Sequence, residues 1–546
     1  MKEHYDAVVI GSGFGGAITA CRLAQSGRTV CIVEKGRRWQ RTEFPRSPHE
    51  LESRAPWDEQ RRDGLLDYRS FPRMDVIQGC GVGGGSLHYF NVAKRPPSAI
   101  FNDPRWPKSI NLRRLTPYYT LAKAMLTAQP ITPNGRKLPL RTQAFWEAAQ
   151  AYGRQPELVD IAVRTDLDGP DSQSACIYCG DCFLGCQVHA KNTLDLNYIR
   201  EAERCGAEVF SQHKAESIEQ SRGRYTVRVS RLRPGVRHAT EDIAVSAEMV
   251  IVAAGTLGSN ELLLKCRDVY KTLPRLSAKL GKGFSGNGDY LLAGTLYDEN
   301  TVVDPSSGPS ITAGLKVAAQ GQQIYIEDLG YSDPLLWYIN ASLPTEQHLQ
   351  QSLLLGWDYL LSSAGLGHTT TRHVEFERLF SGGITTRFLP YLGMGTDAAD
   401  GVFSLDRQNN ILLAWDHSRS MPMFRLMESC LQGISKKSGG KYIRSFLWAS
   451  PINKLLTAHP LGGCALSTSE RNGVVNEFGE VWNYPNLYVA DGSVIPTALA
   501  ANPSATISAL AERTAFHITH PQRKITEEDL AALLPGACCG GSEAQA

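Results

Sequence analysis

The feature that most constrains this chain is a glycine pattern close to its N-terminus. Residues 7–10 are all apolar, as expected of a strand buried on both faces, and a glycine run follows them at once. Residues 17–26 then predict a helix, and residues 29–33 predict a second strand. In such a unit the first glycine permits a tight turn, the second lets a pyrophosphate approach the backbone, and the third lets helix and strand pack closely. The pattern G-x-G-x-x-G is met by Gly11, Gly13 and Gly16.

An acidic residue stands where the second predicted strand ends. Glu34 lies 21 residues after Gly13, where a carboxylate binds the ribose hydroxyls of an adenosine. Phe14 and Gly15 lie in the glycine run before the predicted helix, whose N-terminus offers unpaired N–H groups and a positive dipole to the phosphates. A glycine-rich turn is the alternative for the triplet alone, but strand, helix, strand and acid all fall in register. The sequence therefore predicts a Rossmann-like dinucleotide site, and its N-terminal position favours a tightly held FAD over NAD.

A second glycine loop occupies residues 79–91 and is the densest glycine stretch in the chain. Glycines packed together cost conformational entropy on folding, so they make sense where backbone passes close to something flat or charged. A flexible linker is the alternative, but Val82, Leu87, Tyr89 and Phe90 make the segment too apolar for one. We predict that this loop wraps the phosphates or the ring of the cofactor.

Polar residues near the C-terminus sit among apolar neighbours. His459 lies within such a segment and is a candidate for proton transfer, with a satisfied core histidine as the alternative. Asp491 follows a β-rich run and precedes Gly492, which suits an acid binding a sugar hydroxyl or an ordinary Asp-Gly turn. Asn502 precedes a predicted helix over residues 503–512 and is a candidate ligand or only its N-cap. The residues alone leave each pair of alternatives open.

These motifs together resemble those of the glucose-methanol-choline (GMC) oxidoreductase family. Four blocks spread over the chain carry the resemblance: the fingerprint with Glu34, residues 81–91, residues 253–263 and residues 491–513. The block around His459 is most similar to the cholesterol-oxidase branch and related bacterial sterol or alcohol oxidoreductases. Residues 270–390 carry no comparable likeness.

The resemblance implies an FAD-dependent enzyme that oxidises an alcohol to a carbonyl. It places the ADP half of FAD on the fingerprint and Glu34, and the ribityl or pyrophosphate region beside Asp491 and Gly492. His459 and Asn502 match the family's pair at the reacting carbon, where hydride leaves for the flavin, an imidazole takes the hydroxyl proton and an amide holds the oxygen. The second glycine loop would lie along the pyrophosphate and flavin through Gly81, Gly83, Gly84 and Ser86, with Asn91 near the ring.

The sequence departs from that of the cholesterol oxidases at one functional position. Cholesterol oxidases use a glutamate as the base for the double-bond isomerisation that follows oxidation. An alignment anchored on Tyr391 and Leu392 places Thr385 near that position, and the nearest upstream acids are Glu375 and Glu377. On this comparison neither the isomerisation step nor cholesterol itself as substrate is expected.

Four of the thirteen cysteines form one short cluster with the spacing C-x2-C-x2-C-x3-C, that of bacterial ferredoxin loops. Ferredoxins place a proline after the fourth cysteine, where this chain has Gln187, while Gly180 and Gly185 allow tight turns. Zinc uses two separated pairs more often, disulfides are disfavoured in the cytosol, and unligated cysteines remain an alternative. We predict a [4Fe-4S] cluster on Cys176, Cys179, Cys182 and Cys186.

The order of the motifs predicts an α/β chain (α+β overall) with a Rossmann-like FAD-binding domain and an inserted substrate-binding domain built on a β-sheet. The FAD-binding domain is expected from residues 1–95, 175–265 and 455–520, the substrate-binding domain from 96–174 and 266–454, and a C-terminal tail from 521–546. Within the second insert, residues 334–339 and 353–361 are unusually apolar. They predict core helices, or else a pocket lid or a surface that lies on a membrane and admits a lipid-like substrate.

Composition narrows the possible partners. The chain of 546 residues is 42% hydrophobic and 21% charged, as in ordinary globular proteins. Lys and Arg number 57 against 55 Asp and Glu, a net charge of +2 that gives no reason to expect nucleic acid. No targeting signal or bilayer-spanning run is recognisable, so the cytoplasm is the expected compartment, with at most peripheral membrane contact.

Three functions fit this sequence. The first is oxidation of a bulky apolar alcohol, such as a sterol, a terpenoid or a long-chain alcohol, with dioxygen or an electron-carrier protein as acceptor. The second is flavin-dependent isomerisation, desaturation or hydroxylation of a hydrocarbon-like lipid, with electrons passing through an iron–sulfur cluster. The third is a non-catalytic electron-transfer subunit, against which the pair His459 and Asn502 argues.

Overall fold

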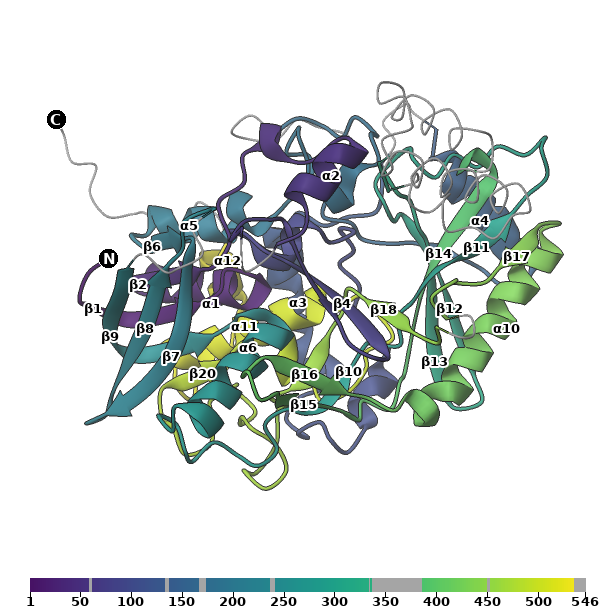
Figure 1. Cartoon of the computed structure of the whole chain (residues 1–546). Coiled ribbons are helices and arrows are strands. Elements are labelled where there is room, and N and C mark those ends of the chain that lie inside the picture. Colours follow the sequence, from purple (N-terminus) through teal and green to yellow (C-terminus); the bar gives the residue numbers. More distant parts are fainter. Residues whose placement is uncertain are drawn as a thin grey trace, which may run out of the picture.

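The computed structural model describes residues 1–57, 61–132, 137–165, 173–235, 241–332, 334–335, 385–448 and 452–534 (Figure 1). The two apolar segments predicted in the second insert lie outside the described residues, except for Pro334 and Leu335. Glu375 and Glu377 lie outside them as well. No helix in the described ranges is long and apolar enough to cross a membrane.

A seven-stranded sheet forms one end of the molecule, in the order β6-β2-β1-β9-β8-β7 with β20 also paired to β9. β6, β2, β1, β9 and β20 run parallel to their neighbours, while β7 and β8 add an antiparallel edge. The predicted apolar runs are its central strands, buried on both faces. The strands are β1 (His4–Ile10), β2 (Val30–Glu34), β6 (Glu208–Ser211), β7 (His213–Ser221), β8 (Arg224–Arg231), β9 (Glu241–Val252) and β20 (Leu487–Val489).

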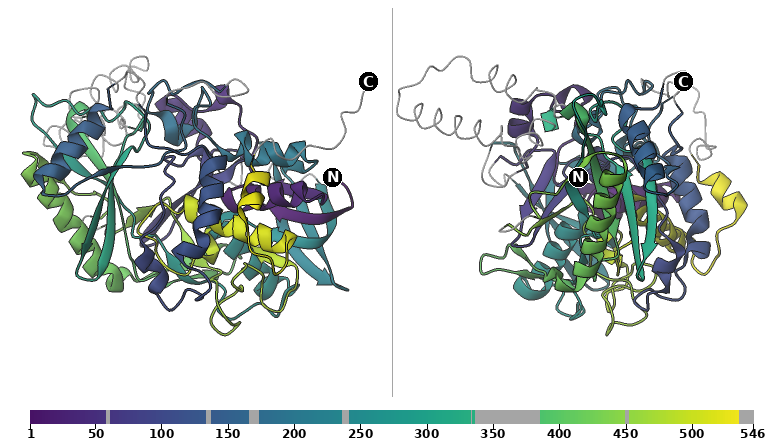
Figure 2. Two further views of the ribbon diagram at one scale, coloured as in Figure 1. Left: turned by 180° about the vertical axis from the view of Figure 1, so that it is seen from behind. Right: turned by 90° about the vertical axis from the view of Figure 1, so that its right-hand side faces the viewer.

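Helices pack against one another beside this sheet. α1 contacts both α5 and α11, and α11 also packs on α3 (Figures 1 and 2). α1 begins three residues before the predicted helix because Gly11 makes the turn: its φ is +98°, and a Cβ there would lie 2.3 Å from the carbonyl oxygen of Ala253. These helices are α1 (Phe14–Gln25), α3 (Leu112–Met125), α5 (Tyr198–Arg204) and α11 (Ser504–Thr519).

A six-stranded antiparallel sheet in the order β17-β11-β14-β13-β12-β5 forms the other large layer. α10 and α4 pack against it, and α10 lies at the end of the molecule away from β1 (Figures 1 and 2). Arg141 on α4 pairs with Asp328 on β13 at 3.2 Å, with both side chains fully buried. The elements are β5 (Glu157–Leu158), β11 (Tyr290–Leu296), β12 (Ala313–Ala319), β13 (Gln322–Asp328), β14 (Phe388–Gly395), β17 (Lys441–Ile443), α4 (Leu140–Ala151) and α10 (Met421–Lys437).

Two small sheets lie between the large ones (Figure 1). The first, β16-β15-β10-β19, comprises β10 (Lys282–Ser285), β15 (Gly401–Leu405), β16 (Ile411–Ala414) and β19 (Leu461–Gly463). The second, β18-β4-β3, comprises β3 (Leu66–Ser70), β4 (Met74–Gly79) and β18 (Leu455–Thr457). Three further α-helices within the described ranges are α2 (Pro48–Arg54), α6 (Gly255–Leu264) and α12 (Glu527–Ala532).

The predicted class, a Rossmann-like α/β unit with a second sheet, is confirmed. All strands of the seven-stranded sheet come from the three segments assigned to cofactor binding, and all strands of the six-stranded sheet come from the two inserts. The domain boundaries themselves stay a prediction. The predicted helix in the tail is present as α12.

Candidate functional site

A large cavity opens where β1 and β2 end, the place at which parallel α/β sheets bind ligands. Its empty volume is about 1810 Å³, counting the space open to solvent at its mouth. It runs from the fingerprint past the second glycine loop and the start of α6 to the segments around His459 and Asn502. Ten of the predicted site residues line it: Gly11, Gly13, Phe14, Gly15, Glu34, Gly84, His459, Asp491, Gly492 and Asn502.

The N-terminus of α1 faces this cavity without a side-chain cap. Gly13 is the N-cap residue, and a Cβ built on it would meet only the Cα of Gly84, at 4.0 Å. The first-turn N–H groups and the helix dipole therefore present a positive end to an open space, which suits a phosphate. Gly16 does not line the cavity, because its Cβ position lies 2.0 Å from the carbonyl oxygen of Gly11, as required for close helix–strand packing.

Glu34 is buried at the end of β2 and holds the local backbone together. Its carboxylate accepts hydrogen bonds from the N–H and Oγ of Ser12, at 3.1 and 2.7 Å, and from the N–H of Gly36 at 2.8 Å. Burial raises its pKa, and these donors oppose the rise. Each carboxylate oxygen has more than one acceptor position, so a ribose hydroxyl can still be bound.

Part of the second glycine loop supports the cavity instead of lining it. The N–H of Gly83 donates to Ser12 Oγ at 3.1 Å, which ties this loop to the fingerprint. Ser86 Oγ accepts from the N–H of Leu194 and donates to the carbonyl oxygen of Gly83. Gly81, Gly83, Ser86 and Asn91 lie outside the lining, whereas Gly79, Gly85, His88, Tyr89 and Phe90 belong to it. The loop borders the cavity through a set of residues that differs in part from the predicted one, and its contact with the cofactor stays a prediction.

Asp491 meets the cavity at the end of β20. Its carboxylate accepts from Ser259 Oγ at 2.5 Å and from the N–H and Oγ of Ser493, so its side chain is already held by protein groups. Burial raises its pKa, and the serine donors oppose that rise. The site therefore presents a fixed Asp491 together with the backbone of Gly492 to the middle of the cavity.

His459 is held in one orientation by an aspartate that sequence reasoning missed. Its Nδ1 lies 2.9 Å from Oδ1 of Asp289, whose side chain is fully buried. The second oxygen of Asp289 accepts from Thr457 Oγ1 at 2.8 Å and from the N–H of Ala458 at 3.2 Å. Because a carboxylate only accepts, Nδ1 carries a proton in this contact, and in the neutral ring the lone pair is then on Nε2.

Asn502 is positioned by Glu327, the second residue that sequence reasoning missed. Asn502 Nδ2 donates to Glu327 Oε2 at 3.1 Å, while Asn502 Oδ1 has no hydrogen-bond partner among the described residues. Burial raises the pKa of Glu327 to about 8. Glu327 lies on β13 beside Leu392 of β14. An acid therefore lies beside Asn502, on the strand next to the one that carries Tyr391 and Leu392, although the sequence comparison had pointed to Thr385 for this role.

His88 is a third missed residue. It is buried, lines the cavity, and its Nδ1 has no hydrogen-bond partner within the described ranges. Burial, with help from Lys191 and His459, lowers its pKa to about 3, so the ring is neutral. No spacing in the sequence distinguishes it from the other polar residues of the glycine loop.

The four clustered cysteines lie close together as thiols rather than as disulfides. Burial raises the pKa of Cys176, of Cys179 (to about 12) and of Cys186, and in each case the neighbouring thiolates add to the rise. Backbone N–H groups oppose it; that of Tyr178, for example, lies 3.4 Å from Cys176 Sγ. Gly180 has a φ of +74°, and a Cβ there would lie 2.0 Å from the carbonyl oxygen of Ser306.

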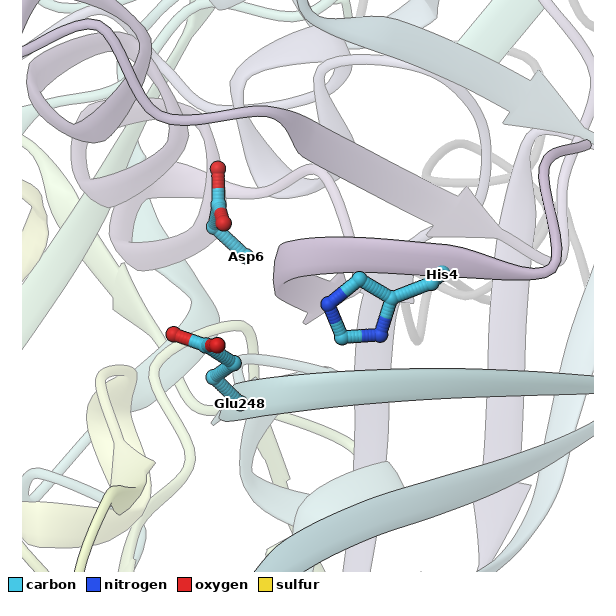
Figure 3. A group of neighbouring side chains, drawn as sticks. All are labelled: His4, Asp6 and Glu248. Carbon is cyan, nitrogen blue, oxygen red and sulfur yellow. The ribbon is translucent and has the colours of Figure 1, made fainter.

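One other group of possible metal ligands occurs among the described residues, on the surface of the seven-stranded sheet (Figure 3). His4 and Asp6 on β1 lie beside Glu248 on β9. Asp6 Oδ2 already accepts from the N–H and Oγ1 of Thr29, both at 2.7 Å. None of the three lines the cavity, so this group is no part of the site.

The fold and the cavity together are those of a dinucleotide-binding protein, and comparison with known proteins gives its family. Two family models, both described as GMC oxidoreductase, match residues 5–266 and 438–511. The chain belongs to the GMC oxidoreductase family and is an FAD-dependent enzyme. The uncapped α1, the open space before Gly13 and the buried Glu34 fit the ADP half of FAD.

The relatives include sterol and long-chain alcohol enzymes. A cholesterol oxidase of Mycobacterium tuberculosis (strain ATCC 25618 / H37Rv) is 28% identical over 94% of this chain and 91% of its own length. A cholesterol oxidase of Acinetobacter baumannii is 27% identical over 96% of both chains, and the long-chain-alcohol oxidase FAO1 of Arabidopsis thaliana is 24% identical over 93% of this chain and 66% of its own. The crystal structure of pyridoxine 4-oxidase from Mesorbium loti shares the fold, with a TM-score of 0.62, 15% identity, and coverage of 95% of this chain and 100% of that one.

Proposed function

We propose that this protein oxidises an alcohol carried on a bulky apolar molecule, such as a sterol, a terpenoid or a long-chain alcohol. The observation that carries the proposal is that His459, held by Asp289, and Asn502 line the same cavity. FAD, when bound, supplies the hydride acceptor. The residues of this chain hold the alcohol and take its hydroxyl proton.

His459 is the proposed base. Its Nε2 carries the free lone pair because Asp289 holds the proton on Nδ1. As the carbinol C–H bond breaks, the hydroxyl proton passes to Nε2, and the buried Asp289 carboxylate stabilises the resulting imidazolium. The Thr457 and Ala458 donors keep that carboxylate aimed at the ring.

Asn502 is the proposed partner for the substrate oxygen. Glu327 fixes one end of its amide, and the amide lies in the cavity wall. Such a fixed amide can hold the oxygen of the alcohol, and then of the carbonyl, in one direction. Glu327 does not line the cavity, so we assign it a positioning role in the oxidation.

Two observations support an apolar substrate. Phe90, Val92 and Ile507 line the same cavity as Asn502, so the cavity offers apolar surface as well as the amide. Cholesterol oxidases and long-chain-alcohol oxidases are among the relatives that align with nearly the whole chain. Both observations favour a lipid-like alcohol over a sugar or choline.

Glu327 also favours a second activity, double-bond isomerisation of the ketone product. Its Oε1 has no hydrogen-bond partner in the described part of the chain, and burial raises its pKa to about 8. A carboxyl group with a pKa near neutrality can take a proton from one carbon beside a carbonyl and return it to another. Glu327 does not line the cavity, whereas Asn502, which bonds it, does, so this step requires the Asn502 amide to move aside.

We also propose that the cysteine cluster binds a [4Fe-4S] centre. A tetrahedral zinc ion would hold its thiolates about 3.8 Å apart, as Zn–S bonds of about 2.3 Å require. No three of the four cysteines, all of which the structure describes, have their sulfurs within 4.8 Å of one another. A cubane cluster needs wider spacing because each thiolate binds a different iron, so the loop suits a cluster better than one ion.

The function is tested by mixing the FAD-loaded protein anaerobically with sterols, long-chain alcohols, sugars and choline. We expect the apolar alcohols to bleach the oxidised flavin and to yield the matching carbonyl. His459→Gln should reduce this rate by about 10²–10⁴-fold, the usual contribution of a general base. His49→Gln, on the exposed face of α2, is the matched control. Turnover of sugars or choline alone, or an unimpaired His459→Gln, would refute the proposal.

A further inference from the structure

We propose that electrons leave the flavin of this protein through the cysteine loop, one at a time, to a one-electron carrier at the protein surface. The inference rests on the proposed alcohol oxidation and on the cluster assigned to Cys176, Cys179, Cys182 and Cys186. It makes the protein a dehydrogenase in which dioxygen is not the principal acceptor.

The cysteine loop lies one side chain away from the flavin cavity. Phe183, directly after Cys182, stacks on Phe90 with ring centroids 5.5 Å apart. The same ring meets His88 edge-on at 5.7 Å. Phe90 and His88 both line the cavity. A single aromatic layer therefore separates the loop from the cavity.

The opposite side of the loop reaches the surface. Cys179 is exposed, and Ile177, two residues before it, is 57% exposed. Cys176 and Cys182 are buried. A cluster bound by these cysteines would thus have one edge toward the flavin and one toward solvent, which is the arrangement that a relay needs.

A buried lysine and a half-buried arginine hold the loop in this position. Lys191 Nζ donates to the carbonyl oxygen of Cys182 at 2.7 Å and to that of Leu87, in the glycine loop, at 2.9 Å. Arg46 pairs with Asp181 at 3.2 Å and donates to the carbonyl oxygen of Gly185 at 2.7 Å. Positive charge beside a cluster favours its reduced, more negative state. Lys191 therefore both joins the two loops and makes the cluster a better electron acceptor.

The electrons and protons balance with a one-electron acceptor. Breaking the carbinol C–H and O–H bonds of one alcohol releases two electrons and two protons and forms the carbonyl. Each electron in turn reduces the oxidised cluster by one unit and then one carrier molecule. One alcohol therefore reduces two carriers, and both protons go to solvent.

The test uses the full-length protein after anaerobic reconstitution with iron and sulfide. Iron and acid-labile sulfide are expected at about four each per chain, the stoichiometry of a [4Fe-4S] cluster. Adding an apolar alcohol without oxygen should bleach the flavin and then produce the electron paramagnetic resonance signal of a reduced cluster. Cytochrome c, a one-electron carrier too large to enter the cavity, should be reduced at two molecules per alcohol.

Variants separate the relay from the alcohol oxidation. Cys182→Ser should lose iron and slow cytochrome c reduction at least tenfold while the alcohol still bleaches the flavin; Cys205→Ser, outside the loop, is the matched control. Phe183→Leu should keep its iron and slow only the transfer to the cluster. Lys191→Met should lower the reduction potential of the cluster.

The negative results distinguish the proposed function from the proposed electron relay. Flavin that no alcohol bleaches would refute the proposed function. Flavin that is bleached in a protein holding only trace iron after reconstitution would overturn the relay alone. The relay would equally be overturned if Cys182→Ser reduced cytochrome c as fast as the wild type, or if dioxygen reoxidised the flavin faster than the cluster did. Should Cys182→Ser fail to fold, Cys179→Ser at the exposed edge provides the same readouts.

Discussion

Replacing Asp289 by asparagine should change the proton position on His459 without changing the shape of the site. In the native chain Oδ1 of Asp289 faces His459 Nδ1, and Oδ2 accepts from Thr457 Oγ1 and the N–H of Ala458. The Ala458 N–H can only donate, so it must face the oxygen of the introduced amide. The nitrogen of that amide then points at Nδ1 and donates to it, which leaves the His459 proton on Nε2.

The size of the expected effect follows from this tautomer switch. With Nε2 protonated, His459 can no longer accept the hydroxyl proton of the alcohol. The loss of a general base slows a reaction by about 10²–10⁴-fold, or about 3–5 kcal/mol at about 1.4 kcal/mol per factor of ten. Binding of FAD and of the alcohol should change little, since neither uses the Asp289 carboxylate directly.

Stopped-flow measurement of flavin bleaching under anaerobic conditions, at saturating apolar alcohol, checks this prediction. Asp397→Asn is the matched control: Asp397 is similarly buried, bonds Ser285 Oγ at 2.7 Å and the N–H of Gly288 at 3.0 Å, and does not line the cavity. A rate for Asp289→Asn close to that of the wild type, with normal FAD content and melting temperature, would refute the assignment of His459 as the base.

Three further predictions concern stability and cofactor binding. The pKa of Glu327 rises from 4.5 to about 8 on folding, so the free energy of unfolding of the wild type should fall as the pH rises through this window. Thermal melts at several pH values should show a weaker pH dependence of stability in Glu327→Gln. Arg141→Met leaves the Asp328 carboxylate buried and unpaired, which should cost about 3–5 kcal/mol in urea unfolding, against about 0–1 kcal/mol for Arg419→Met at an exposed pair. Gly13→Val should fill the space before α1 and lower the flavin-to-protein absorbance ratio of the purified protein; an unchanged ratio would contradict the placement of FAD there.

Local patterns were sufficient to predict the cofactor half of the molecule. The apolar runs before Gly11 and Glu34 form β1 and β2, and the glycines fall at the turn and at the helix start. These features follow from short-range rules, because strand, turn and helix are adjacent in sequence. Gly180 and Gly185 likewise adopt positive φ values in the cysteine loop.

The residues that hold His459 and Asn502 in place could not be predicted from local patterns. Asp289 is separated from His459 by 170 positions, and Glu327 is separated from Asn502 by 175. Only the pairing of β13 with β14, and the turn before β11, bring them to the cavity region. Residue type alone does not identify Glu327 as a site residue. The next residue, Asp328, is also acidic, but it points to the opposite face of β13 and pairs with Arg141 in the core.

The central claim, hydride transfer from an apolar alcohol with His459 as base, is tested most directly by one anaerobic single-turnover measurement. The FAD-loaded protein is mixed with a sterol or long-chain alcohol carrying either hydrogen or deuterium on the carbinol carbon. The account predicts that the flavin is bleached, that deuterium slows the bleaching, and that His459→Gln slows it further. Flavin that stays oxidised with every apolar alcohol, in a protein shown to hold FAD, would contradict it.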